Sequence, residues 1–359
     1  MTTVHAPFWG EFRSNNPIRR RVRICASLSI GLLFGGSLAA HSAEEVSEET
    51  IHIPGPVNGL KLGLRHASTQ GIPAASGRPV VLILHGSTVP VSGNADYSFN
   101  GRSLVTALAH SGLDVWALDF YGFGESDRYP EMTQPADKNP PLGTAEECAN
   151  QVDSVVAYLK RERGVDRIML IGDSGGSLVA GVFATRRPRL VSRLVLFAPV
   201  TPFTSAPSSQ TVLPAYALVT PLEIWVQLTT WSEAAGKPDV LDSTAYRAWA
   251  DTYLHSDSTS GTRTPPSVKI PNGRQADLVA ISRGRFTYDP SMIQAPTLIV
   301  MGEWDEVATF PGAEWLLKSL RRAPQRRLVV IGHGSHTIQL ETERTQLYRV
   351  MSDFLNERE

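Results

Sequence analysis

Apolar and polar residues change their spacing several times along this chain, and each spacing predicts a different kind of element. Short runs that are apolar at nearly every position are typical of strands buried on both faces of a parallel sheet. Segments with the apolar spacing of helices lie between these runs. This alternation predicts an α/β fold with a mostly parallel central sheet and helices on both faces. The buried strands are predicted at residues 79–84, 114–119, 168–171, 194–199, 296–302 and 327–331.

Other segments depart from this pattern in informative ways. Residues 51–66 alternate roughly between apolar and polar side chains, which predicts an antiparallel hairpin at an edge of the sheet. Residues 128–143 are rich in proline and are predicted to be irregular. Thr144 and Glu147 have the spacing of a capping box, so a helix is predicted to begin there. Helices are predicted near residues 101–110, 144–160, 313–320 and 341–355.

The strand and helix alternation stops after residue 199 and resumes near residue 291. Residues 200–290 contain repeated prolines together with several tryptophans and tyrosines. We therefore predict a core at residues 44–199 and 291–359, with residues 200–290 inserted as a helical cap. The aromatic residues of this segment fit either an apolar substrate pocket or the packing of the cap onto the core.

The N-terminus has the features of an export signal. Arg19, Arg20, Arg21 and Arg23 precede an apolar stretch at residues 26–40, and small residues follow it. The alternative is an uncleaved anchor helix, which is disfavoured because the apolar stretch contains glycines and is too short to span a bilayer comfortably. Residues 1–43 are therefore predicted to be a signal peptide, which leaves an exported protein, periplasmic or secreted, without a stable membrane span.

Composition excludes several classes of function. With 359 residues, of which 42% are hydrophobic, the chain suits one large globular domain or a domain with an insertion. Its net charge is −1, and no long basic run lies outside the N-terminus, so nucleic-acid binding is not indicated. The cysteines, Cys25 and Cys148, cannot build a disulfide framework. Cys148 is predicted to be an inert buried thiol.

Residues 172–176 are the first candidate for chemistry. Their sequence, Gly-Asp-Ser-Gly-Gly, has the G-x-S-x-G spacing of a nucleophile elbow and stands between a predicted strand and a predicted helix. The turn is crowded, so it requires small residues two positions before and after Ser174, which Gly172 and Gly176 provide. The N–H groups that begin the helix favour negative charge at the serine oxygen.

Two other interpretations of this motif remain. A glycine-rich turn with an incidental serine has the same pattern. The same five residues also surround the nucleophile of chymotrypsin-like proteases, which are all-β proteins with several disulfides and a serine near the C-terminus. The strand and helix alternation, and the long chain after Ser174, disfavour the protease interpretation.

The ends of other predicted strands carry further candidates. His85, Gly86 and Ser87 follow the strand at 79–84, where an oxyanion-binding loop is expected. Asp305 follows the strand at 296–302, and His336 follows the last strand. Parallel strands end at one edge of a sheet, so Ser174, Asp305 and His336 are predicted to converge there.

Some neighbouring residues are alternatives or have a structural interpretation. Glu303 lies near Asp305 and His333 lies near His336, so each is a rival for the same role. Asp119 ends the strand at 114–119, and we interpret it as a structural residue that fixes the next loop by hydrogen bonds.

Together these pieces resemble the α/β-hydrolase family over nearly all of residues 50–359. The matching pieces are His85-Gly86, Asp119 with residues 122–126, residues 172–176, Gly302 with Asp305, and Gly334 with His336 and Glu341. The resemblance implies a Ser-His-Asp hydrolase whose cap is inserted after the sixth strand of the core sheet. The spacing of His336 to Glu341 fits the family and favours His336 over His333.

The resemblance implies an activity and assigns roles to residues. Ser174 would be the nucleophile, His336 the base and Asp305 the residue that orients it, while the N–H groups of Ser87 and Gly175 would form the oxyanion hole. No cofactor and no metal are expected. The expected partner is a small carboxylic ester or lactone. Peptidase, amidase and acyltransferase activities use the same groups, and a non-catalytic binding protein on this fold is a further alternative. Dehalogenases and epoxide hydrolases need a carboxylate where Ser174 stands.

Overall fold

The computed structural model describes residues 45–69, 78–99, 101–203, 213–234, 237 and 240–357. The predicted signal peptide at residues 1–43 lies outside these residues. None of the helices in this part of the chain has the length and apolar character that crossing a membrane requires.

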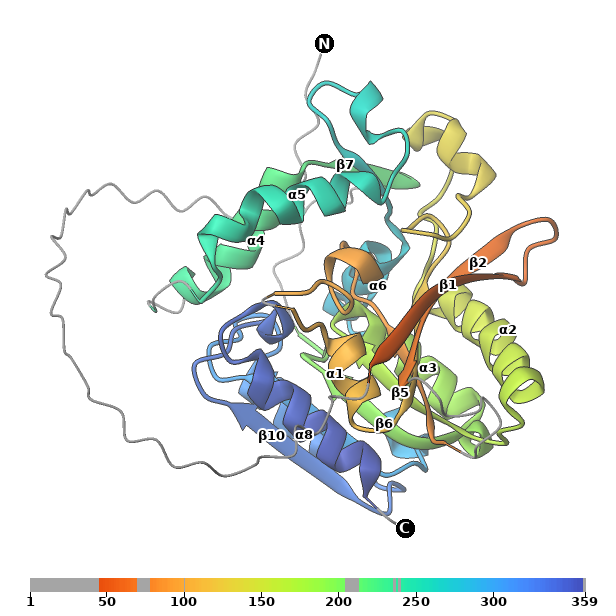
Figure 1. The fold of residues 1–359 in the computed structure, drawn as a ribbon, viewed down its shortest axis with the longest axis vertical. Helices are drawn as coiled ribbons and strands as arrows, with labels where there is room; N and C mark the ends of the chain where they lie inside the picture. Colours follow the sequence, from red (N-terminus) through yellow and green to blue (C-terminus); the bar gives the residue numbers. More distant parts are fainter. Residues whose placement is uncertain are drawn as a thin grey trace, which may run out of the picture. The chain divides into compact units, whose positions relative to one another are not determined.

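A twisted sheet forms the centre of the fold (Figure 1). Within the described residues it has eight strands in the order β1-β2-β4-β3-β5-β6-β9-β10. The hairpin of β1 and β2 is antiparallel and occupies one edge, while the strands from β4 to β10 run parallel to one another. This confirms the predicted fold class. The strands are β1 (Val46–Pro54), β2 (Lys61–Thr69), β3 (Val80–Leu84), β4 (Asp114–Asp119), β5 (Ile168–Asp173), β6 (Val191–Phe197), β9 (Thr297–Gly302) and β10 (Arg326–Ile331).

The apolar runs of the sequence form the middle of this sheet. Every residue of β3, β4, β5 and β9 is buried, as expected for strands covered on both faces. Leu82 of β3 lies between Trp116 of β4 and Leu170 of β5 in the strand register. By contrast, β10 is an edge strand, and only Ile331 of its six residues is buried.

Helices cover both faces of the sheet and build two apolar cores. One core contains residues of α2, α3 and α7, and the other contains residues of α1 and α8. Thr144 and Glu147 form the predicted capping box at the start of α2, and Gly164 ends this helix with a φ of 64°. The helices are α1 (Leu104–His110), α2 (Ala145–Arg163), α3 (Gly175–Arg186), α4 (Pro221–Ala234), α5 (Tyr246–His255), α6 (Gly273–Ser282), α7 (Phe310–Ser319) and α8 (Arg344–Asn356).

The segment predicted as a helical cap, residues 200–290, also contains strands. Helices α4, α5 and α6 lie in it, but β7 (Tyr216–Val219) and β8 (Val268–Pro271) form a small antiparallel sheet. Each strand has four residues, and the two lie far apart in sequence, so neither produced a recognisable strand pattern. The segment leaves the sheet after β6 and returns at β9, which is the neighbour of β6.

Candidate active site

Ser174 occupies a strained turn between β5 and α3. Its φ of 48° and ψ of −118° are unusual for a residue with a side chain. Its N–H donates to the carbonyl of Phe197 on β6 (2.9 Å). A Cβ added to Gly172 would lie 2.6 Å from the carbonyl oxygen of Gly176, and one added to Gly176 would lie 2.7 Å from that of His85. The predicted need for small residues around the serine is therefore confirmed.

The three residues predicted to converge are joined by hydrogen bonds. Ser174 Oγ lies 2.9 Å from His336 Nε2, and His336 Nδ1 lies 2.9 Å from Asp305 Oδ2. Asp305 Oδ1 also accepts from the N–H groups of Val307 (2.8 Å) and Ala308 (2.7 Å), which fixes the carboxylate. An Nδ1–H that donates to Asp305 leaves Nε2 free of a proton, so Nε2 can accept from the serine hydroxyl.

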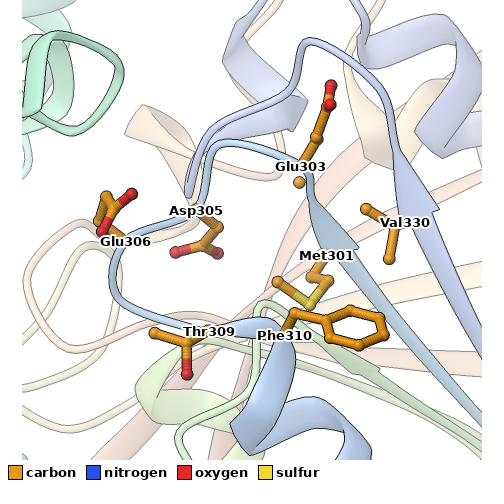
Figure 2. Close-up of a pocket in the computed structure, with 8 residues that line it drawn as sticks. Met301, Glu303, Asp305, Glu306, Thr309, Phe310 and Val330 are labelled. Atoms are coloured by element: carbon orange, nitrogen blue, oxygen red, sulfur yellow. The ribbon is translucent and has the colours of Figure 1, made fainter. Parts of the chain in front are cut away.

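The two rival residues take other positions. His333 is exposed, and its ring packs against Trp304 with centroids 5.1 Å apart. Its backbone N–H donates to Glu303 Oε2 (3.1 Å). Figure 2 shows the Glu303 carboxylate pointing away from that of Asp305. The geometry therefore favours His336 and Asp305.

A pocket of about 350 Å³ lies beside the acid member of this group (Figure 2). Among the described residues, Ser174 and His336 are not part of its lining, so the pocket lies next to Asp305 rather than over the serine. The lining residues are Met301, Gly302, Glu303, Asp305, Glu306, Thr309, Phe310 and Val330.

Several carboxylates control the charge of His336. Burial lowers the pKa of the imidazole, but Asp305, Asp173 and Glu341 raise it, and the net result is a pKa above the ordinary value of 6.5. Asp173 is itself buried, and burial raises its pKa to about 6. The charged form of His336 is thus stabilised by the carboxylates around it.

A polar chain that the sequence did not reveal fixes Asp173. Asn94 Nδ2 donates to Asp173 Oδ2 (2.7 Å), and Gln339 Nε2 donates to Asn94 Oδ1 (2.6 Å). The chain connects the loop after β3, the nucleophile elbow and the loop after β10. Asn94 and Gln339 belong to no motif, so only the folded arrangement identifies them.

Glu341 fixes the loop that carries His336. It accepts hydrogen bonds from the backbone N–H (2.8 Å) and the hydroxyl of Ser335, and from the Thr337 hydroxyl (3.2 Å). The bonds therefore hold the residues on both sides of His336. Burial raises the pKa of Glu341, while these hydrogen bonds oppose the rise.

The predicted oxyanion residues lie beside Ser174. A Cβ added to Gly86 would lie 3.4 Å from Ser174 Cβ, and one added to Gly175 would overlap Ser87 Oγ. Gly175 is the first residue of α3, where backbone N–H groups have no acceptor within the helix. Ser87 and Gly175 are thus adjacent to each other and to the serine.

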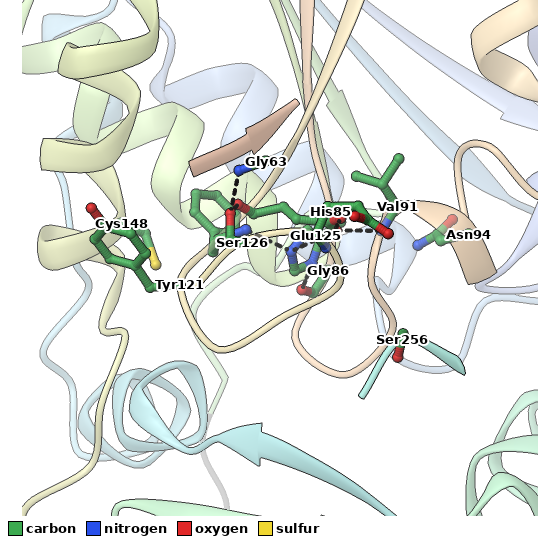
Figure 3. Close-up of polar contacts among 12 residues, drawn as sticks. Gly63, His85, Gly86, Val91, Asn94, Tyr121, Glu125, Ser126, Cys148 and Ser256 are labelled. Atoms are coloured by element: carbon green, nitrogen blue, oxygen red, sulfur yellow. Dashed lines mark hydrogen bonds and ion pairs between the residues drawn. The ribbon is translucent and has the colours of Figure 1, made fainter. Parts of the chain in front are cut away.

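Asp119 has the structural role predicted for it. Its Oδ1 accepts from the N–H of Val91 (2.8 Å) and its Oδ2 from the N–H of Glu125 (3.0 Å), so it joins the loops after β3 and β4. Figure 3 labels Val91 and Glu125 of this group, together with Ser126, whose hydroxyl accepts from the N–H of Gly63 (2.8 Å). Burial raises the pKa of Asp119 to about 6.

Two aromatic residues of the predicted cap segment, Trp249 and Tyr253, are buried. Both lie on α5, and their rings stack with centroids 5.3 Å apart. Trp249 Nε1 donates to the carbonyl of Gly93 in the loop after β3 (3.0 Å). These two residues therefore support the packing interpretation rather than an apolar pocket. Cys148 is buried as predicted, and burial raises its pKa to about 12.

Comparisons with known proteins identify the family and the fold. A family profile described as the alpha/beta hydrolase fold matches residues 79–343. A 2-hydroxy-6-oxononadienedioate/2-hydroxy-6-oxononatrienedioate hydrolase of Klebsiella pneumoniae is 32% identical over 120 residues. That match spans 33% of this chain and only about a third of the relative, 36% of its length.

Solved structures share the fold at low sequence identity. A thioesterase domain from the curacin biosynthetic pathway has a TM-score of 0.57 and 16% identity, covering 87% of this chain and 100% of that chain. A thermophilic esterase from Thermogutta terrifontis has a TM-score of 0.53 and 17% identity, covering 86% of this chain and 98% of that chain. At identities this low, the structural similarity establishes a common fold only, and activity has to be argued from the site itself.

Proposed function

The chain belongs to the α/β-hydrolase fold family, and on this premise we propose that it is a serine hydrolase that cleaves carboxylic esters or lactones. The proposal rests on one observation, the continuous hydrogen-bonded chain from Ser174 Oγ through His336 to Asp305. Such a chain supplies a nucleophile, a base and a group that orients the base.

The first half of the reaction forms an acyl-enzyme. Ser174 Oγ attacks the carbonyl carbon while its proton moves to His336 Nε2, and the carbonyl oxygen becomes an oxyanion. The N–H groups of Ser87 and Gly175 stabilise that oxyanion, each by about 3 kcal/mol in comparable enzymes. The C–O bond then breaks, and His336 returns the proton to the leaving alkoxide.

The second half releases the acid. His336 takes a proton from water, the resulting hydroxide attacks the acyl carbon, and Ser174 leaves with the proton that His336 returns. Asp305 stabilises the imidazolium in both halves without being protonated itself. Amides and acyl acceptors other than water use the same groups, so the choice of substrate depends on the residues around the site.

Replacement of the nucleophile tests this proposal directly. We expect wild-type protein to react with a fluorophosphonate probe and to hydrolyse p-nitrophenyl esters or lactones. Ser174→Ala should lose both reactions and keep its circular dichroism spectrum, because the hydroxyl contributes little packing.

A panel of p-nitrophenyl esters of increasing chain length, several lactones and an anilide would identify the preferred bond. Labelling that persists in Ser174→Ala would remove Ser174 from the role of nucleophile. A wild-type protein that is neither labelled nor active would favour a binding protein on this fold.

A further inference from the structure

Arg274 brings a buried positive charge from the predicted cap segment to the candidate oxyanion hole. It is the second residue of α6 and is only 2% exposed. The start of α6 is fixed against the start of α2, because Gly273 N–H donates to the carbonyl of Leu142 (2.6 Å) and Asp277 Oδ2 accepts from the N–H of Ala145 (2.7 Å). The position of the Arg274 side chain is therefore set by the fold.

The guanidinium of Arg274 is held in place by several groups. It packs on the rings of Phe120 and Phe123, with its central carbon 4.9 and 5.0 Å from their centroids. Its Nη1 lies 3.2 Å from Cys148 Sγ, and its Nη2 donates to the carbonyl of Gly86 (3.1 Å).

The stem of the same side chain reaches the other half of the oxyanion hole. A Cβ added to Gly175 would lie 3.2 Å from Arg274 Cδ, so the methylene packs against that glycine. Arg274 thus contacts Gly175 itself and the carbonyl of Gly86, the residue before Ser87.

The carbonyl of Gly86 is informative because it belongs to the same peptide unit as the N–H of Ser87. A second donor also reaches this carbonyl, since His85 Nδ1 lies 2.8 Å from it. The N–H of Phe120 points to His85 Nε2 (3.3 Å), which places the single ring proton on Nδ1. Burial, and then the charge of Arg274, lower the pKa of His85 well below 6.5, so the ring is neutral and this tautomer persists.

We propose that Arg274 is a positioning residue for the oxyanion hole, which holds and polarises the Gly86–Ser87 peptide together with His85. Rotation of this peptide away from the substrate breaks both hydrogen bonds to its carbonyl. Donation to a carbonyl also strengthens the N–H on the other side of the same amide, because hydrogen bonds in a chain polarise one another. The inference rests on the proposed function, because it assigns Arg274 to the same reaction.

Arg274→Met tests the inference because methionine keeps the apolar stem and removes the guanidinium. We expect kcat on the preferred ester to fall by roughly 10- to 100-fold, with KM changed by less than about threefold. Affinity for a trifluoromethyl ketone, which forms an oxyanion on Ser174, should fall in proportion to kcat/KM. Arg274→Lys keeps the charge and one donor and should recover part of kcat.

Arg283→Met is the matched control, because Arg283 is exposed at the end of the same helix. It should behave like wild-type protein. If Arg274→Met does not fold, Arg274→Gln replaces it as the variant without the charge and is compared with Arg274→Lys. Failure of all three variants to fold would make Arg274 a stability residue and overturn the proposal.

Other outcomes separate this inference from the proposed function. Unchanged kcat in a folded Arg274→Met variant of an active enzyme would overturn the inference alone. A second outcome would also overturn the inference: a rise in KM without a fall in kcat, seen only with esters that carry a carboxylate. Arg274 would then be binding substrate, and its Nε is available for this because it has no hydrogen-bond partner among the described residues. A wild-type protein without labelling or activity would remove the proposed function and this inference with it.

Discussion

Three carboxylates surround His336, and the pH dependence of the reaction should reflect them. His336 must be neutral to accept the serine proton, and its pKa is raised above 6.5. The acid limb of kcat/KM should therefore have its midpoint above pH 6.5. Asp173→Asn removes one of the charges that raise this pKa and keeps an oxygen to accept from Asn94, so the limb should move to lower pH.

A pH profile of kcat/KM with a neutral ester measures this shift. Asp251→Asn, which changes an exposed aspartate on α5, is the control and should leave the profile in place. A profile that does not move in Asp173→Asn, in a variant with wild-type stability, would show that Asp173 does not act on His336.

The two histidines of the loop after β10 should differ sharply in their effect on activity. His336→Ala removes the base that contacts Ser174 and should lower kcat by about a thousandfold or more. His333→Ala removes an exposed ring that packs on Trp304 and should change kcat by less than about threefold. Steady-state kinetics on one ester measure both values, and the opposite ranking would contradict the assignment.

Site residues at strand ends could be predicted from the sequence. Residues that reach the site from distant parts of the chain could not. Ser174, Asp305 and His336 each follow an apolar strand, and the order of strands along the chain brings their ends together. Arg274 and Gln339 have no such marker. They reach the site only because α6 and the loop after β10 pack where they do, which depends on contacts between distant parts of the chain.

At the scale of elements, the elbow depends on close contact between α3 and the end of β3. A Cβ on Gly176 would lie 2.7 Å from the carbonyl oxygen of His85 and would overlap that of Leu84, and backbone atoms cannot yield as side chains do. Gly176→Ala should therefore lower the free energy of unfolding by about 1–3 kcal/mol or more. Urea unfolding followed by fluorescence measures the difference.

Gly261→Ala is the matched control for this change. No atom lies within 4 Å of a Cβ built at Gly261, and its φ lies outside the left-handed region. Alanine there should be neutral or slightly stabilising, because it restricts the unfolded chain. Equal stability of the two variants would show that the contact between α3 and β3 is not as tight as described.

Elements with a local sequence signal were easier to predict than elements that depend on distant pairing. The capping box at Thr144 and the wholly buried β4 follow from local sequence. Strands β7 and β8 have four residues each, and they exist because they pair with each other across a long separation. Local periodicity carries no information about such a pairing.

At the scale of the whole molecule, the N-terminal pattern supports a proposal about location. We propose that residues 1–43 direct export and are removed. Protein recovered from a secreting bacterial host should have an intact mass of about 34–35 kDa instead of 39.1 kDa, and should lie outside the cytoplasm. The remaining cysteine, Cys148, is buried, so activity should not respond to thiol reductants. A full-length cytoplasmic species that begins at Met1 or Thr2 would contradict export.

The backbone at Ser174 also bears on how this chain would evolve. Its φ of 48° and ψ of −118° match the first central position of a type II′ turn, which glycine adopts most readily. A side chain there costs about 1–3 kcal/mol. If catalysis were no longer under selection, selection for stability would favour glycine at position 174, because that replacement removes the strain of the side chain. Under the proposed function, the strain at Ser174 is the stability cost of placing a hydroxyl in this turn.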